Sequence, residues 1–217
     1  MTMNATQWMS RVIKPAVFAL CLIPAAMLAW DAFTHHLGAN PVETLNHRTG
    51  LWTLRLLLIT LCVTPLRRLT GWNIVIRLRR MLGLYTFLYA CLHLSTWLVF
   101  DHFFDVREIV KDIVKRPYIT VGFAAWLMLI PLAVTSTRKW VKRLGSRWAK
   151  LHQLVYVIAT FGILHYLWLV KADVRDPVIY GSLLAVLLGY RAWIRRAAMM
   201  PAGKAAASYK LKAESGG

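Results

Sequence analysis

The sequence predicts an all-α membrane protein, a bundle of six transmembrane helices. Hydrophobic residues make up 58% of the 217 residues, whereas soluble domains usually contain about 45 to 50%. Six apolar runs, each near the roughly 20 residues that span a bilayer, are separated by short charged segments. Because lipid cannot hydrogen-bond the backbone, such runs must be helices or a closed barrel, and the alternating pattern of a barrel is absent from the sequence.

Each run is bounded by charged residues, which gives its place in the chain. The bounding pairs are, in chain order, Lys14 and Asp31, Arg48 and Arg67, Arg80 and Asp101, Arg116 and Arg138, Lys150 and Lys171, and Asp176 and Arg191. The expected spans are 13–32, 51–66, 81–100, 118–134, 151–170 and 177–194. They form one transmembrane domain over residues 1–200, and residues 201–217 are expected to be a disordered tail.

The first run could be read as a signal peptide, because Arg11 and Lys14 precede it. Its apolar stretch from Pro15 to Trp30 is long for the hydrophobic region of such a peptide. We therefore expect a retained first span, which also lets the second span enter the membrane from the correct side.

Lys and Arg collect in alternate connections, and this predicts the orientation of the bundle. Most of the 27 basic residues lie in the N-terminal segment, the 66–80 loop, the 135–150 loop and the tail from residue 191. These four segments together contain a single acidic residue, Glu214. Basic short loops stay on the cytoplasmic side. Both termini are therefore expected to be cytoplasmic.

The formal charge of +18 does not indicate a nucleic-acid-binding protein. Such a protein would display its basic residues on a folded soluble face, whereas here they lie between apolar runs. Anionic membrane lipid is the simpler partner for the basic loops, and an acidic flavin reductase is the alternative.

Small residues inside the spans are expected to serve packing. Three cysteines at no metal-ligand spacing are read as small buried residues: Cys21, Cys62 and Cys91. Four glycines are expected to let helices approach closely: Gly83, Gly122, Gly162 and Gly181. Gly162 lies one turn before His165 and could also make room for a flat cofactor.

Ionisable residues inside a bilayer are costly and therefore indicate function. The bodies of the spans contain no Asp or Glu, one arginine, Arg55, and three histidines, His93, His152 and His165. Neutral imidazole binds heme iron, and two imidazoles from facing helices fill both axial positions. That arrangement favours electron transfer over substrate binding.

The depth of each histidine predicts which two form a pair. His93 lies ~18 Å along the third span and His165 ~21 Å along the fifth, at ~1.5 Å per residue, and both spans enter from the same side. The two are therefore level in the outer half of the membrane and could hold one heme. The alternative is that each ring only hydrogen-bonds a neighbouring helix.

His152 and Arg55 are secondary candidates. His152 lies ~20 Å before His165 but ~140° away around an ideal helix, so the two share a face only if the helix is distorted. His152 could bind heme with another partner, or lie near a flavin or quinone. Arg55 could pair with a heme propionate or extend to the outer interface. The remaining histidines are expected to be solvated or in partner contacts: His35, His36, His47 and His102.

Three segments carry a family resemblance: RRMLGLYTFLYACLHL at 79–94, RPYITVG at 116–122 and KLHQLVYVIATFGILHYLW at 150–168. They resemble the MsrQ family, also called YedZ, the heme-binding membrane subunits of the periplasmic protein-methionine-sulfoxide reductase system. The resemblance covers residues 11–194 and implies a bundle of ferric-reductase-like type in the bacterial inner membrane. The family's heme-associated histidines match His93, His152 and His165.

The resemblance further implies heme b and FMN as cofactors, and electrons drawn from quinones. The electrons would pass to a periplasmic molybdopterin methionine-sulfoxide reductase of MsrP type. The chain would thus be an electron-transfer subunit and not itself the reductase. Unlike oxidase relatives, it lacks a second histidine on the third span and has no attached flavin and nicotinamide domain, so direct NADPH oxidation is not expected.

Two other functions stay open at this point. A different b-type cytochrome, such as a ferric-chelate reductase subunit, would share the heme but not the partner. A proton-coupled transporter would use the histidines as a relay, but such carriers usually place Asp or Glu at membrane depth.

Overall fold

The computed structural model describes residues 4–170 and 172–199, and all regular secondary structure in these ranges is helical. The α-helices are α1 (Ala5–Trp8), α2 (Lys14–Phe33), α3 (Pro41–Thr70), α4 (Arg79–Thr96), α5 (Val106–Lys115), α6 (Pro117–Val134), α7 (Arg138–Leu144), α8 (Ser146–Leu151), α9 (Leu154–Leu169) and α10 (Arg175–Met199). Short π or 3₁₀ segments, Met9–Ile13, Asn73–Leu78 and Trp97–Asp101, extend α2 and α4.

Within the part of the chain that the structure describes, six helical stretches are long and apolar enough to cross a membrane. They are Thr6–Phe33, Pro41–Thr70, Asn73–Asp101, Pro117–Val134, Ser146–Leu169 and Arg175–Ala197. This confirms the predicted all-α class with six membrane-spanning helices. The expected tail over residues 201–217 lies outside the described residues, and the cytoplasmic location of the termini stays a prediction.

The second span was expected to begin at residue 51, whereas its helix, α3, begins earlier, at Pro41. The side chain of Asn40 accepts a hydrogen bond from the N–H of Glu43, and a proline occupies the first turn. Both features are typical of helix starts. The segment before the second span is therefore rigid helix rather than loop.

Two further connections also contain helices. The 101–117 segment holds α5, and the 135–150 segment holds α7 and α8. One packing expectation is wrong as well, because Cys62 is exposed on α3. Of the other two cysteines, Cys21 is buried and Cys91 is half-buried.

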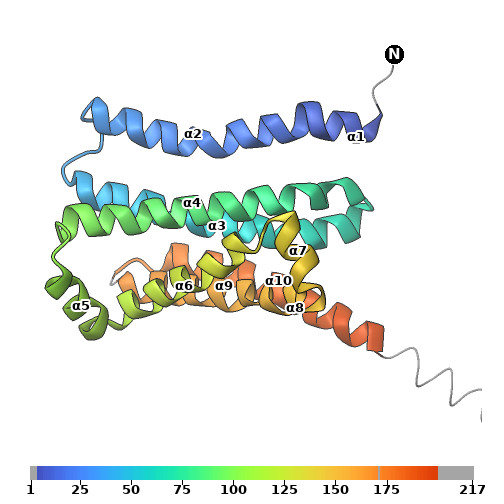
Figure 1. Ribbon diagram of the computed structural model, residues 1–217. Coiled ribbons are helices and arrows are strands. Elements are labelled where there is room, and N and C mark those ends of the chain that lie inside the picture. The colour runs from blue at the N-terminus through green and yellow to red at the C-terminus, as the bar shows by residue number, and fades with distance from the viewer. Residues whose placement is uncertain (1–3, 171, 200–217) are drawn as a thin grey trace, which may run out of the picture.

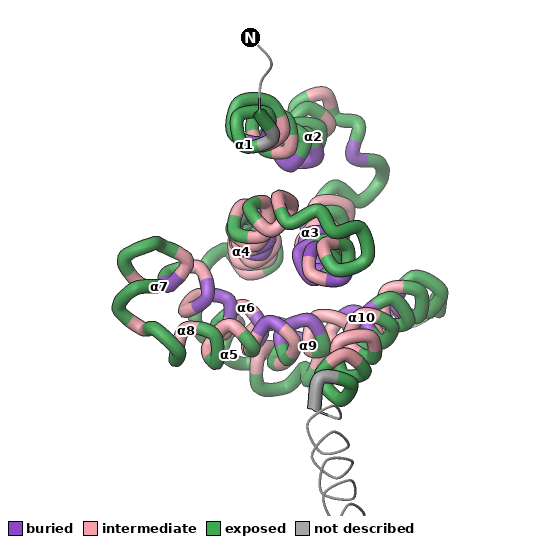
Figure 2. Tube along the Cα trace, turned by 90° about the vertical axis from the view of Figure 1, so that its right-hand side faces the viewer, coloured by how far each residue is buried: buried purple, intermediate pink, exposed green. Residues whose placement is uncertain are grey.

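The long helices form three layers, seen end-on in Figure 2. α2 is the first layer, α3 and α4 are the second, and α6, α9 and α10 are the third. Both ends of the described chain lie at one end of the bundle, and α5 lies at the other (Figure 1). This end with α5 is called the α5 end below, and the opposite one the terminal end.

The main core lies between the second and third layers. In the apolar 18-residue stretch of α3, 50% of the residues are buried, whereas only 17% are buried in the first span. α3 is therefore the central helix. Its leucines pack with small and branched residues of the third layer: Leu54, Leu57, Leu58 and Leu61 with Ala125, Ile158 and Ala159. The histidine-bearing helices α4 and α9 are fixed on either side of this core.

A buried tyrosine attaches the outlying helix α2 to the second layer. The hydroxyl of Tyr89, which has no exposed surface, donates to the carbonyl of Cys21 at 2.8 Å and accepts from the N–H of Ala25 at 2.9 Å. These two backbone groups would pair with each other in an uninterrupted helix. The hydroxyl is thus inserted into the hydrogen-bond ladder of α2 beside Pro24.

Replacing Tyr89 by phenylalanine is expected to loosen α2 and lower the apparent Tm of the purified protein. The change removes both hydrogen bonds, and the two backbone groups regain a partner only if α2 closes on itself at this point, so the expected cost is about 1–3 kcal/mol. Tyr85→Phe is the control, because its hydroxyl makes a single bond, to the carbonyl of Phe18. Thermal unfolding in detergent should show the larger decrease for Tyr89→Phe, and equal decreases would refute this role.

Candidate functional site

Two histidines from different layers meet near the α5 end. His93 lies on α4 and His165 on α9, and their ring centroids are 6.1 Å apart with the ring planes at 75°. The structure thus brings together the two residues whose depths along their helices suggested a pair.

The Nδ1 atom of each ring makes a hydrogen bond to a backbone carbonyl. Nδ1 of His93 donates to the carbonyl of Asn46 at 3.0 Å, and Nδ1 of His165 donates to the carbonyl of Tyr118 at 2.7 Å. A carbonyl oxygen can only accept, so Nδ1 must carry the proton and Nε2 keeps a lone pair. This is the arrangement found for histidines that bind a metal through Nε2.

A glycine on the facing helix leaves room for each ring. A Cβ atom at Gly122 would lie 2.6 Å from Nδ1 of His165, which is far inside van der Waals contact. A Cβ atom at Gly50 would lie 3.1 Å from Cε1 of His93. Any larger residue at either position must therefore displace the ring that it faces.

The two halves of the site follow one pattern. In each, the accepting carbonyl lies 47 residues before the histidine, and the glycine follows the carbonyl residue by one helical turn. The first half comes from α3 and α4 and the second from α6 and α9. Two helix pairs of equal register thus present one imidazole each.

This geometry suits a metal held between two imidazoles. Two rings on opposite sides of one ion, at about 2 Å per metal–nitrogen bond, have centroids about 6 Å apart. The observed 6.1 Å meets that requirement. A heme iron with two axial histidines therefore fits the residues present.

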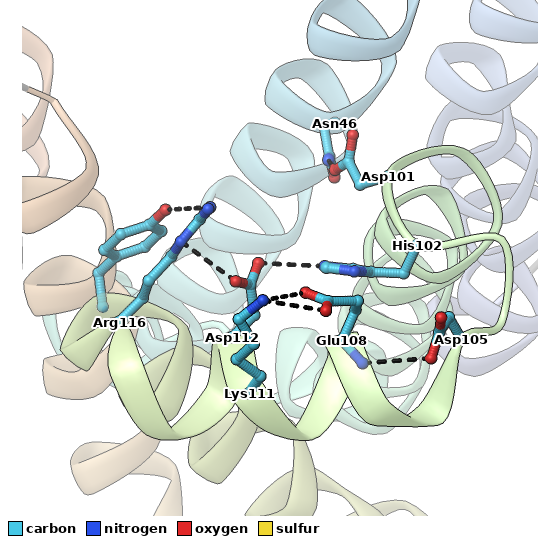
Figure 3. Close-up of polar contacts among 9 residues, drawn as sticks. Asn46, Asp101, His102, Asp105, Glu108, Lys111, Asp112 and Arg116 are labelled. Carbon is cyan, nitrogen blue, oxygen red and sulfur yellow. Dashed lines mark hydrogen bonds and ion pairs between the residues drawn. The ribbon is translucent and has the colours of Figure 1, made fainter.

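Polar contacts hold α5 across the same end of the bundle (Figure 3). The Asp112 carboxylate lies 3.2 Å from Nε2 of His102, close enough for an ion pair when that ring is protonated, and 3.3 Å from Nε of Arg116. Arg116 also donates to the hydroxyl of Tyr118 at 3.4 Å. Because the Tyr118 carbonyl accepts from His165, α5 helps to fix a residue that orients the site.

Comparison with known proteins gives the family. A family model described as ferric reductase like transmembrane component matches residues 49–163. The protein-methionine-sulfoxide reductase heme-binding subunit MsrQ of Herminiimonas arsenicoxydans is 55% identical over 202 residues, covering 90% of this chain and 93% of the relative. The chain belongs to the MsrQ family.

Two further MsrQ proteins align with this chain over a similar length. The subunit of Xanthomonas campestris pv. campestris strain B100 is 53% identical over 191 residues, which are 85% of this chain and 88% of the relative. The subunit of Xanthomonas axonopodis pv. citri is 54% identical over 186 residues, which are 83% of this chain and 85% of the relative. No solved structure matches the chain.

In this MsrQ-family chain, the helix is interrupted at His152, between α8 and α9. The angle of ~140° for an ideal helix therefore does not apply. The Nε2 atom of His152 lies 3.0 Å from Oγ1 of Thr135, and the ring stacks on Trp148 with centroids 4.1 Å apart. The structure places His152 against the end of α6, with a tryptophan rather than a histidine as its ring partner.

Arg55 is also engaged within the protein. Its Nε donates to the hydroxyl of Tyr180 on α10 at 2.8 Å, and its guanidinium lies 5.1 Å from the ring centroid of Trp52. It follows Gly50 on α3 by five residues, or ~7.5 Å along the helix. These contacts hold Arg55 between α3 and α10, about 1.4 helical turns along α3 from Gly50.

Sequence reasoning missed part of this MsrQ-type site. Asn46 and Gly50 fell in an expected loop, and the accepting atoms are backbone carbonyls, which leave no signature in a sequence. The Asn40–Pro41 helix start was the signal that could have placed them on α3. Gly122 was expected to allow close packing, and its close neighbour is His165. Gly162 was expected to allow close packing and could also have made room for a cofactor; a Cβ atom there would lie at an ordinary 3.7 Å from Leu54.

Proposed function

We propose that the chain is the heme-binding membrane subunit of a protein-methionine-sulfoxide reductase system and transfers electrons through heme b held by His93 and His165. The pair of imidazoles with both Nδ1 atoms fixed by carbonyls carries this proposal. The names of the relatives support it, since they describe heme-binding subunits of that system. Reduction of methionine sulfoxide then belongs to a partner protein.

When bound, heme would supply reversible one-electron reduction, and His93 and His165 would be the residues that hold it. The residues of the chain set the conditions for it. The carbonyls of Asn46 and Tyr118 fix the tautomer of each ring and make Nε2 more basic. Gly50 and Gly122 allow the rings to stand close to the facing helices.

Arg55 and His152 are assigned supporting roles in this proposal. Arg55 uses Nε for Tyr180, so its two terminal nitrogens could bind a heme propionate as a fork. His152 lies ~20 Å from His165 along the axis of the fifth span. It therefore belongs to a different level of the bundle. We infer that it takes part in a second cofactor site, with heme or FMN as the candidates that the resemblance implies.

The direction of electron flow follows from the expected orientation. His93 and His165 lie near the C-terminal ends of α4 and α9, and α4 leads through Trp97–Asp101 to α5, so the pair is at the α5 end and away from the chain ends. If both termini are cytoplasmic, the pair is in the periplasmic half of the bacterial inner membrane. Electrons from quinones, or from a cytosolic flavin reductase, would then reach a periplasmic molybdopterin reductase of MsrP type.

The purified protein is expected to show a low-spin b-type spectrum after reduction with dithionite, with heme close to stoichiometric. Stopped-flow mixing should then show rapid reoxidation by the molybdopterin reductase with methionine sulfoxide, and slow reoxidation by ferric chelates. A correctly folded but colourless preparation would remove the basis for electron transfer. Equal reoxidation rates would instead favour a ferric-chelate reductase subunit, a function compatible with the family model.

A further inference from the structure

A cavity rich in arginine lies at the terminal end of the bundle, at the opposite end from the paired histidines. Its volume is about 220 Å³. The lining residues come from α3, α4, α9 and α10 and are Thr64, Arg68, Arg79, Tyr156, Tyr190, Arg191, Ile194 and Arg195. None of these residues is acidic, so four guanidinium groups share one small space without a carboxylate.

Arg191 is fixed in place by the surrounding helices. One terminal nitrogen donates to the carbonyl of Leu61 at 2.9 Å, and the other donates to the hydroxyl of Tyr156. The guanidinium also lies 4.9 Å from the ring centroid of Tyr156. A donor held in this way loses little side-chain freedom when it binds a ligand.

Two buried polar atoms of the cavity residues have no partner among the described residues. They are Nε of Arg191 and Oγ1 of Thr64. Burying a donor without a hydrogen bond is unfavourable, and such atoms in a native protein indicate a missing ligand or water. Both residues belong to the lining of the cavity, so a ligand seated among them is the candidate partner.

The uncompensated positive charge of the cavity also favours an anion. The ion pairs formed within the described residues involve none of its four arginines. Arginine forks match phosphate oxygens in geometry and charge. Four guanidinium groups with nearby hydroxyls offer more donors than one carboxylate can accept, so phosphate is the better match.

We propose that this cavity binds the phosphate group of an anionic ligand. The phosphate could belong to an anionic phospholipid headgroup, as in basic pockets between membrane helices, or to a soluble phosphate compound. The site is separate from the paired histidines, because Arg79 precedes His93 on the same helix by 14 residues, or ~21 Å. The proposal therefore stands whether or not the chain binds heme.

Binding measurements on the full-length purified protein test this proposal. Equilibrium dialysis with radiolabelled inorganic phosphate and with FMN covers the soluble sources. Native mass spectrometry from nanodiscs of phosphatidylglycerol or phosphatidylcholine covers the lipid source. We expect one-to-one binding of a soluble probe, or retention of phosphatidylglycerol but not of phosphatidylcholine.

Three variants locate the binding. Arg195→Gln and Arg191→Gln should each weaken it about tenfold or more, because each removes a charged donor. Arg196→Gln is the matched control, since it removes the same charge from the next position of α10, outside the cavity lining. Arg195 is exposed, so its replacement tests the site even if Arg191→Gln impairs folding.

Each outcome is decisive. Binding of phosphate or FMN that the cavity variants lose assigns a soluble ligand, and loss of phosphatidylglycerol retention in them assigns a lipid. Absence of binding by all probes overturns the proposal. Equal weakening by Arg196→Gln also overturns it, because the effect would then arise from general surface charge.

Discussion

Replacing His93 or His165 by alanine is expected to remove most of the heme from the purified protein. In the proposed site each histidine would supply one of the two imidazole ligands of the iron, and the two rings are 6.1 Å apart, so either substitution would remove half of the ligand set. The pyridine hemochrome assay gives heme per polypeptide. His152→Ala should retain a substantial fraction, because that ring lies at another level, on Trp148.

A structural control accompanies these variants. Size-exclusion chromatography and circular dichroism should show that all three fold, so that heme loss reflects ligation. If His152→Ala lost all heme while His165→Ala retained it, the assignment of the pair would be wrong. If added imidazole partly restored the heme content of the His93→Ala variant, the missing group would be identified as the imidazole ring itself.

The substitution Gly122→Ala is expected to lower heme content nearly as strongly as removal of a ligand. The new methyl group would lie 2.6 Å from Nδ1 of His165, so the ring must shift, and Nδ1 is the atom that donates to the Tyr118 carbonyl. Alanine otherwise favours a helix over glycine by about 1 kcal/mol. A loss of heme in a more stable helix would therefore isolate the steric effect.

Gly83→Ala is the matched control, because its Cβ would lie 3.9 Å from the nearest atom, Cγ2 of Thr60. Gly50→Ala should have an intermediate effect, given a closest approach of 3.1 Å to the ring of His93. Heme content and the reduced spectrum are compared across the three variants. Full occupancy with an unchanged spectrum in Gly122→Ala would refute the close-packing role of this glycine.

The sequence was sufficient to predict the number of spans and the meeting of His93 with His165. Long apolar runs must be helices in lipid, and the constant rise of a helix converts residue counts into depth. Neither step requires knowledge of neighbouring side chains. Both predictions therefore depend on general geometry rather than on details of packing.

Other features depended on local structure that the apolar pattern does not encode. α3 extends to Pro41 because Asn40 caps it, although residues 41–50 are too polar to be read as a span. His152 lies at a break in the helix, where an angle from ideal geometry fails. The contact of Arg55 with Tyr180 joins residues 125 positions apart and follows from the tertiary fold.

The division of the histidine pair between two helix hairpins has a consequence for assembly. During synthesis, the ring on α4 enters the membrane well before the ring on α9, because α5 to α8 must follow first. A nascent chain that ends before α9 contains only one of the two histidines, His93. If the two histidines hold one heme as proposed, stable binding must await insertion of the fifth span, and the bound heme would then link the second layer to the third.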